Sequence, residues 1–137
     1  PNDHAAFGLS VSLSGDTALV AAPGIGAATY IFVRAADGTW KQQHRMGGFT
    51  VLQSVSISGN MAVASGAQSI PPRIFARTAD GTWDEQDMLT PMDDSWFLDL
   101  FGISVSISGD VVIVGAPRYD NKGDDAGAAY IHTIPDK

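Results

Sequence analysis

The amino-acid sequence predicts an all-β fold of tandem four-stranded antiparallel sheets, and three observations predict it. One seven-residue segment occurs three times, at residues 10–16, 54–60 and 104–110, so the copies begin 44 and then 50 residues apart. An Ala-Asp-Gly-Thr-Trp segment at 36–40 recurs at 79–83. The 15 glycines and 7 prolines are spread along the chain, which favours many short strands joined by turns.

The thrice-repeated segment predicts the first strand of each unit and the turn after it. Its Ser-Val-Ser-Leu-Ser or Ser-Val-Ser-Ile-Ser run alternates small polar and branched apolar residues, as a strand with one buried face does. Ser10, Ser12 and Ser14 then share one face, where small side chains let neighbouring sheets approach. Each run is followed by a Gly-Asp or Gly-Asn pair. Glycine as the first of two turn residues suits a type II′ hairpin turn.

Three more strands are predicted for a complete unit. The second is apolar at successive positions, as expected for a strand covered on both faces. Asp37-Gly38 and Asp80-Gly81 predict type I′ turns between the third strand and a polar fourth strand at the outer edge. The expected ranges are 18–22, 61–65 and 111–115 for the second strand, 30–34, 73–77 and 130–132 for the third, and 39–45 and 82–88 for the fourth.

The length of the repeat predicts blades of a β-propeller, each of about 40 to 50 residues. Residues 1–137 are expected to form a single repeat domain with units at approximately 7–50, 51–100 and 101–137. The last unit is truncated, because no Asp-Gly-Thr-Trp strand follows it. About three blades cannot close a ring of the usual four to eight, so the ring is incomplete within this chain. We expect the chain to belong to a larger propeller, or copies of it to associate.

Composition and charge narrow the possible functions. The absence of cysteine excludes disulfides, zinc–thiolate sites and thiol catalysis. The net charge is −7 and the eight Lys and Arg form no cluster, which argues against a nucleic-acid partner. No apolar run approaches the roughly 18 residues of a membrane helix, so membrane insertion is not expected.

The third unit contains three short motifs: Phe101-Gly102, Gly115-Ala116-Pro117, and the glycine and apolar residues of 127–131. Through these motifs it resembles an FG-GAP repeat of the integrin-α-like β-propeller family. The first unit matches through Phe7-Gly8 and Ala21-Ala22-Pro23. The second is degenerate, with Val51-Leu52 in place of Phe-Gly and Ser65-Gly66-Ala67 in place of Gly-Ala-Pro.

The resemblance implies a non-catalytic binding or adhesion module of a secreted or cell-surface protein, with a protein or glycan as ligand. It also makes Ca²⁺ possible, although no cofactor is required. In integrin blades the first hairpin often expands into an Asp-rich calcium loop. Here that hairpin has only a two-residue turn, which departs from the calcium-binding pattern.

One loop of the third unit carries the only candidate metal ligands. Its oxygen-bearing side chains alternate around a glycine bend, as in part of a calcium loop, although Lys122 would oppose a cation. The alternative is a polar surface turn. The candidate ligands are Asp120, Asn121, Asp124 and Asp125.

Trp96 and Phe97 are the candidate binding residues. They stand among acids between the second and third units, as in a carbohydrate or protein contact. The alternative is that they fill the gap between blades, as expected of Phe7 and Phe101. The recurring Trp40 and Trp83 are expected to be packing residues.

No catalytic residue is predicted. The three histidines fall at non-equivalent places in the repeat, and no nucleophile motif accompanies them. Two alternatives to a binding module remain. One is a structural subunit that assembles through its open blade faces with other copies or another chain. The other, less favoured, is a hydrolase or lyase on a propeller scaffold.

Overall fold

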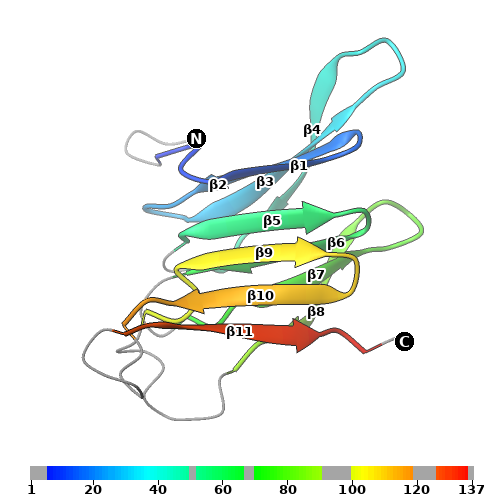
Figure 1. Ribbon diagram of the computed structural model, residues 1–137. Helices are drawn as coiled ribbons and strands as arrows, with labels where there is room; N and C mark the ends of the chain where they lie inside the picture. The colour runs from blue at the N-terminus through cyan, green and yellow to red at the C-terminus, as the bar shows by residue number, and fades with distance from the viewer. Residues whose placement is uncertain (1–5, 50–51, 67–69, 91–99, 119–125, 136–137) are drawn as a thin grey trace.

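The computed structural model describes residues 6–49, 52–66, 70–90, 100–118 and 126–135. These residues form eleven strands in three antiparallel sheets and no helix (Figure 1), which confirms the predicted all-β blades. The first sheet contains β1 (Val11–Ser14), β2 (Thr17–Ala22), β3 (Ala28–Arg34) and β4 (Trp40–Met46). The second contains β5 (Ser54–Ser58), β6 (Met61–Ser65), β7 (Arg73–Arg77) and β8 (Trp83–Met88). The third contains β9 (Ser104–Ser108), β10 (Val111–Ala116) and β11 (Ala128–Thr133).

Each sheet is a meander, because its strands lie side by side in chain order. The polar strands β4 and β8 are edge strands, as expected from their composition. The sheets stack face to face, with β5 in contact with both β1 and β9. Figure 1 shows β1, β5 and β9 running side by side across the stack. The second sheet therefore lies between the other two, and the described residues form no closed ring.

Two hydrophobic cores fill the spaces between the sheets. One lies between the first and second sheets, where Leu19 and Ile31 meet Ile57 and Phe75. The other lies between the second and third sheets and includes Val63, Ile74, Ile107 and Val114. The second strand of the second sheet, β6, is buried on both faces, whereas the second strand of the third sheet, β10, buries only alternate residues.

The turn after each first strand is of type II′, as predicted. Ser14 pairs with Thr17, so only Gly15 and Asp16 form the loop. Gly15 has φ of +54°, and its equivalents Gly59 and Gly109 have +56° and +58°. The aspartate or asparagine that follows has no positive φ, and this combination defines the II′ turn.

The predicted type I′ turns at the outer hairpins are wrong. A type I′ turn needs positive φ at both central residues, but Gly38 has φ of +85° and Asp37 does not share it. Ala35 instead receives a hydrogen bond at its carbonyl from Gly38 N (2.9 Å), and its own N–H donates to Thr39 O (2.7 Å). The loop therefore has three residues, and the hairpin at Asp80-Gly81 has the same bonds.

Candidate functional site: blade faces and a groove between sheets

The residues predicted to bind a ligand or a metal lie outside the described residues. This applies to Trp96 and Phe97, and to Asp120, Asn121, Asp124 and Asp125, whose roles stay predictions. Elsewhere in the chain, the described residues contain no group of three or more His, Asp or Glu that could hold a metal ion. Within those same ranges there is also no helix with the length and apolar character needed to cross a membrane.

A row of serine side chains joins the first sheet to the second. Ser10 Oγ accepts a hydrogen bond from Val55 N (3.1 Å), and Ser12 Oγ accepts one from Ile57 N (3.0 Å). Ser14 Oγ completes the row by accepting from the N–H of the turn glycine of the second sheet at 3.0 Å. The bonds connect serine side chains in and just before β1 to backbone N–H groups in and just after β5.

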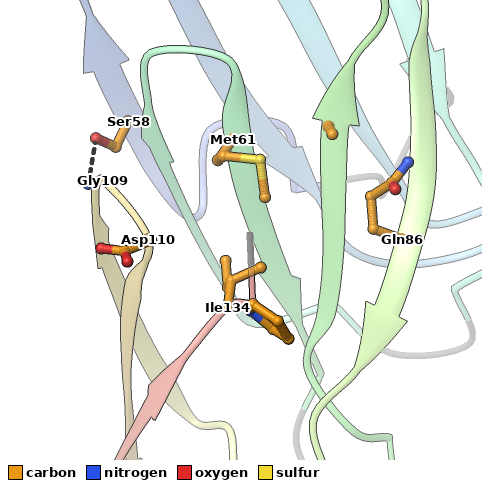
Figure 2. Close-up of a pocket in the computed structure, with 8 residues that line it drawn as sticks. Ser58, Met61, Gln86, Gly109, Asp110 and Ile134 are labelled. Carbon is orange, nitrogen blue, oxygen red and sulfur yellow. Dashed lines mark hydrogen bonds between the residues drawn. The ribbon is translucent and has the colours of Figure 1, made fainter. Parts of the chain in front are cut away.

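The same row is repeated between the second and third sheets. Ser54 Oγ accepts from Val105 N (3.2 Å) and Ser56 Oγ from Ile107 N (3.1 Å). Ser58 Oγ accepts from the Gly109 N–H at 2.9 Å, the dashed line in Figure 2.

These serines accept hydrogen bonds from backbone N–H groups at a strand edge that has no partner within its own sheet. β5 and β9 are each paired on one side only, so the N–H groups of the other edge need partners from outside the sheet. The alternation of the sequence predicted small side chains at a close approach of blades. The structure adds that their hydroxyls fix the register between neighbouring blades, which no single-strand pattern could indicate.

The Phe-Gly motif forms a turn that packs one blade on the previous one. Ile103 N donates to Leu100 O (3.1 Å), and Gly102 N donates to Gly115 O (3.0 Å). Leu100 has φ of +55° and Gly102 of +90°. Phe101 is buried, with its ring edge-on to Tyr130 at 5.3 Å.

Gly102 has no room for a side chain. A Cβ there would overlap Ser65 Oγ and lie 3.1 Å from the Gly66 carbonyl oxygen. Ser65 is the last residue of β6 in the second sheet, and Gly66 follows it. Gly8 occupies the equivalent turn in the first unit with φ of +94°, yet a Cβ there would meet nothing within 4 Å. The difference arises because no sheet precedes the first one in the described structure.

A groove of about 340 Å³ lies between the second and third sheets, at the end where the first hairpins turn (Figure 2). Met61 and Ile134 lie toward one another across it, and Gln86 and Asp110 stand at its sides. Its remaining lining is formed by Ser58, Ala76, Gly109 and Pro135. The floor is therefore mainly apolar and the rim polar.

The groove exists because isoleucine replaces arginine at one repeat position. Arg77 N donates to Asn60 O (2.8 Å), and Ile134 N makes the equivalent bond to Asp110 O (2.7 Å). The Arg77 guanidinium reaches back to the first sheet and donates to Gln43 Oε1 (3.3 Å). Ile134 has no such reach, so the corresponding space beside β8 stays open.

Two β-bulges direct glutamines toward these spaces. In β4 the register shifts so that Gln43 is the extra residue, and in β8 Gln86 is the extra residue. A bulge re-aims the side chain of its extra residue. Gln43 thereby meets Arg77, and Gln86 borders the groove. The sequence carries no local signal for either bulge.

Aspartates in the outer hairpins are held ionised. The Thr39 hydroxyl and amide donate to Asp37 Oδ1 at 2.7 and 3.0 Å, which holds the pKa of Asp37 below its ordinary value. Asp80 Oδ1 accepts from the hydroxyls of Thr78 and Thr82 and from Thr82 N. These donors lower the pKa of Asp80 to about 2.

The outer side of the first sheet is an open apolar face. Val11 and Leu13 are each 66% exposed, whereas the equivalent Val55 and Ile57 of the second sheet are 4% and 5% exposed. We call this the first open face; its large apolar residues are Phe7, Val11, Leu13, Phe32 and Trp40.

Two expectations about packing residues are corrected on this face. Trp83 is a buried packing residue, as predicted, but Trp40 is 43% exposed and lies beside the Arg34 guanidinium. Phe101 fills a gap between blades, but Phe7 is 45% exposed. Trp40 and Phe7 both occupy positions that a preceding sheet would cover.

The outer side of the third sheet is the second open face. Ile131 is 74% exposed there, whereas the equivalent Ile74 of the second sheet is fully buried. Ile113 is likewise exposed and its counterpart Val63 is buried. We define the second open face by Ser104, Ser106, Ser108, Val111, Ile113 and Ile131.

Comparison with known proteins agrees with this architecture. Residues 83–132 match the family model of the FG-GAP repeat. The chain contains an FG-GAP repeat. The matched segment starts at β8 and runs through the Phe101-Gly102 turn, β9 and β10 to β11, so it includes the second open face. No curated protein matches the chain.

Proposed function

We propose that this chain is a non-catalytic binding module of a secreted or cell-surface propeller protein, and that the groove beside Ile134 takes an apolar side chain of a protein ligand. The family of its FG-GAP repeat supports a binding role in adhesion. The groove is the observation that carries the proposal. An apolar floor with a few polar groups at the rim is the usual form of a ligand pocket.

The lining favours a protein over a glycan as ligand. Met61, Ala76, Ile134 and Pro135 offer apolar surface, whereas a sugar would need several hydrogen-bonding groups. Gln86 and Asp110 at the sides can bind the backbone or a polar neighbour of the inserted side chain.

A peptide-display selection against the immobilised chain, run in parallel with a glycan array, tests this proposal. The matched control is Ile134→Arg, which introduces the residue found at the equivalent Arg77 and fills the groove. We expect apolar-anchored peptides that bind the wild type and lose at least about tenfold in affinity for Ile134→Arg. Equal binding to both proteins would place the ligand elsewhere, and no binding in either format would contradict a binding function.

A second candidate function is that of a structural subunit that assembles through its open blade faces. The observation favouring it is the pair of open faces, whose equivalents are buried wherever a neighbouring sheet is present. Its test is the mass of the native particle by light scattering. A monomer at all accessible concentrations, with its fold intact, would contradict this candidate.

A further inference from the structure

The two interfaces within the chain follow one rule. Three serines of one first strand accept hydrogen bonds from alternate N–H groups of the next first strand, at distances of 2.9 to 3.2 Å. The apolar residues between those N–H groups enter the core formed with the preceding sheet. The partnership is directional, because one side supplies hydroxyl acceptors and the other supplies N–H donors.

The second open face offers the acceptor half of the same interface. Ser104, Ser106 and Ser108 are exposed there, at the positions equivalent to the bonding serines of the first and second sheets. Beside them is a depression of about 210 Å³, lined by Ser104, Val105, Ser106, Ile113, Gly115 and Ala129. The equivalent place on the first sheet is covered by a branched side chain of β5, because Val55 packs there with Leu19 and Ala21.

The first open face offers the donor half. β1 pairs only with β2, and the N–H groups of its other edge belong to Val11, Leu13 and Gly15. These residues are the equivalents of Val55, Ile57 and Gly59, which donate to serines in the first interface. Val11 and Leu13 are exposed branched apolar residues, as are the residues expected to fill the depression on the second open face.

We propose that the first open face of one copy of this chain binds the second open face of another, head to tail. Ser104, Ser106 and Ser108 of one copy accept hydrogen bonds from the N–H groups of Val11, Leu13 and Gly15 of its partner copy. A second copy is the occupant because both halves of the interface lie on this chain and match position by position. The inference deepens the second candidate function and rests on it, but not on the binding groove.

Two copies joined at both pairs of faces bring six sheets together. That number falls within the usual range of about four to eight blades for a closed propeller. The interface is heterologous, and such an interface closes only if the rotation between copies completes the ring. We therefore expect a particle of twice the 14.4 kDa of one chain.

Charged substitutions on each open face test the pairing. Leu13→Glu and Ile131→Glu each place a carboxylate at an exposed position, so the fold itself should tolerate them. Light scattering is expected to give a dimer for the wild type and a monomer for each variant alone. Ile25→Glu is the matched control, because Ile25 is 88% exposed and lies on neither face; it should remain a dimer.

Mixing the two variants tests the direction of the pairing. Leu13→Glu retains the second open face and Ile131→Glu retains the first, so an equimolar mixture should form a one-to-one complex through one intact junction. A wild-type monomer would overturn the proposal. So would a Leu13→Glu variant that still dimerises by itself, because it would show that like faces pair.

The serine row is tested by replacing its three hydroxyls. The Ser104→Ala, Ser106→Ala and Ser108→Ala triple variant keeps the apolar surface but removes the acceptors. The closed dimer has two junctions, so the variant loses six hydrogen bonds in all. At roughly fivefold in affinity for each bond, the triple variant should dimerise on the order of ten-thousandfold more weakly, as measured by sedimentation. An unchanged dissociation constant would overturn the role of the serines.

The outcome can be separated from that of the binding proposal. The groove lies between the second and third sheets and includes neither Leu13 nor Ile131. A monomeric Leu13→Glu protein that still binds the selected peptides would support both proposals. A wild-type chain that binds the peptides as a monomer would overturn only the head-to-tail pairing.

Discussion

Gly102 shows how one residue decides whether two blades can approach. The Phe-Gly turn brings its backbone against Ser65 and Gly66 of the preceding sheet, where a Cβ has no room. The positive φ adds a second requirement, because L side chains rarely adopt it. The two requirements can be separated, since Gly8 has nearly the same φ in open space.

We therefore expect Gly102→Ala to destabilise the chain more than Gly8→Ala. Gly8→Ala carries only the backbone strain of a left-handed residue, about 1 to 2 kcal/mol. Gly102→Ala adds steric overlap with the second sheet, which costs about 1 to 3 kcal/mol more. Denaturant unfolding of both variants measures the difference. Equal losses of stability would show that packing against Ser65 contributes nothing at this position.

Among single residues, the serines show what a sequence pattern can and cannot predict. Their alternation places them on one face of each first strand, and the structure confirms this placement. Their role as hydrogen-bond acceptors depends on the register between two different sheets. The bonds of that register join residues 45 and 51 apart in the sequence, so no local pattern contains it.

At the scale of one element, Asp80 accepts hydrogen bonds within the turn of the β7–β8 hairpin. The Thr78 hydroxyl donates a hydrogen bond to Asp80 in addition to those from Thr82. The first hairpin has no such donor, because Ala35 occupies the equivalent position. The ionised carboxylate accepts all of these bonds, so its protonation weakens the hairpin. The folded-state pKa of about 2 lies below the ordinary aspartate pKa near 3.9.

The pH dependence of this hairpin follows from the sign of the shift. A lowered pKa stabilises the folded state above the unfolded-state pKa, and this stabilisation is lost as the pH falls from about 4 to about 2. A carboxyl carbon NMR titration should place the midpoint of Asp80 near 2. Thr82→Val should raise it and leave the titration of Asp37 unchanged. A wild-type midpoint near 4 would contradict the hydrogen bonds described here.

The elements divide into those that the sequence predicts and those that it does not. Strict alternation and Gly-Asp pairs predicted the first strands and their type II′ turns correctly. The predicted type of the outer turns was wrong because Asp37 and Asp80 each accept a hydrogen bond from the threonine two residues later in the chain. This bond favours a three-residue loop. The bulges at Gln43 and Gln86 arise from the pairing of strands, and no local sequence pattern indicates them.

For the whole molecule, a repeat alignment cannot show where a stack of sheets ends. Trp40 and Trp83 are equivalent by sequence, yet only Trp83 is covered by a neighbouring sheet. Leu13 is likewise exposed although its equivalent Ile57 is buried, and Ile131 is exposed although its equivalent Ile74 is buried. Burial of a repeat position therefore depends on whether a neighbouring sheet covers it, and the exposed members of an otherwise buried set mark the two open faces.

If copies supply the missing interfaces, thermal stability must depend on protein concentration. Association that requires the folded state stabilises it by mass action, and the gain grows with concentration above the dissociation constant. The wild-type Tm should then rise by roughly a few degrees for each tenfold increase in concentration. Differential scanning calorimetry from about 5 to 500 μM measures this dependence. Leu13→Glu should have a Tm that does not change with concentration, and Ile25→Glu should behave as the wild type does. A wild-type Tm that stays constant across this range would show that the folded chain gains nothing from its neighbours, and the open faces would then need another explanation.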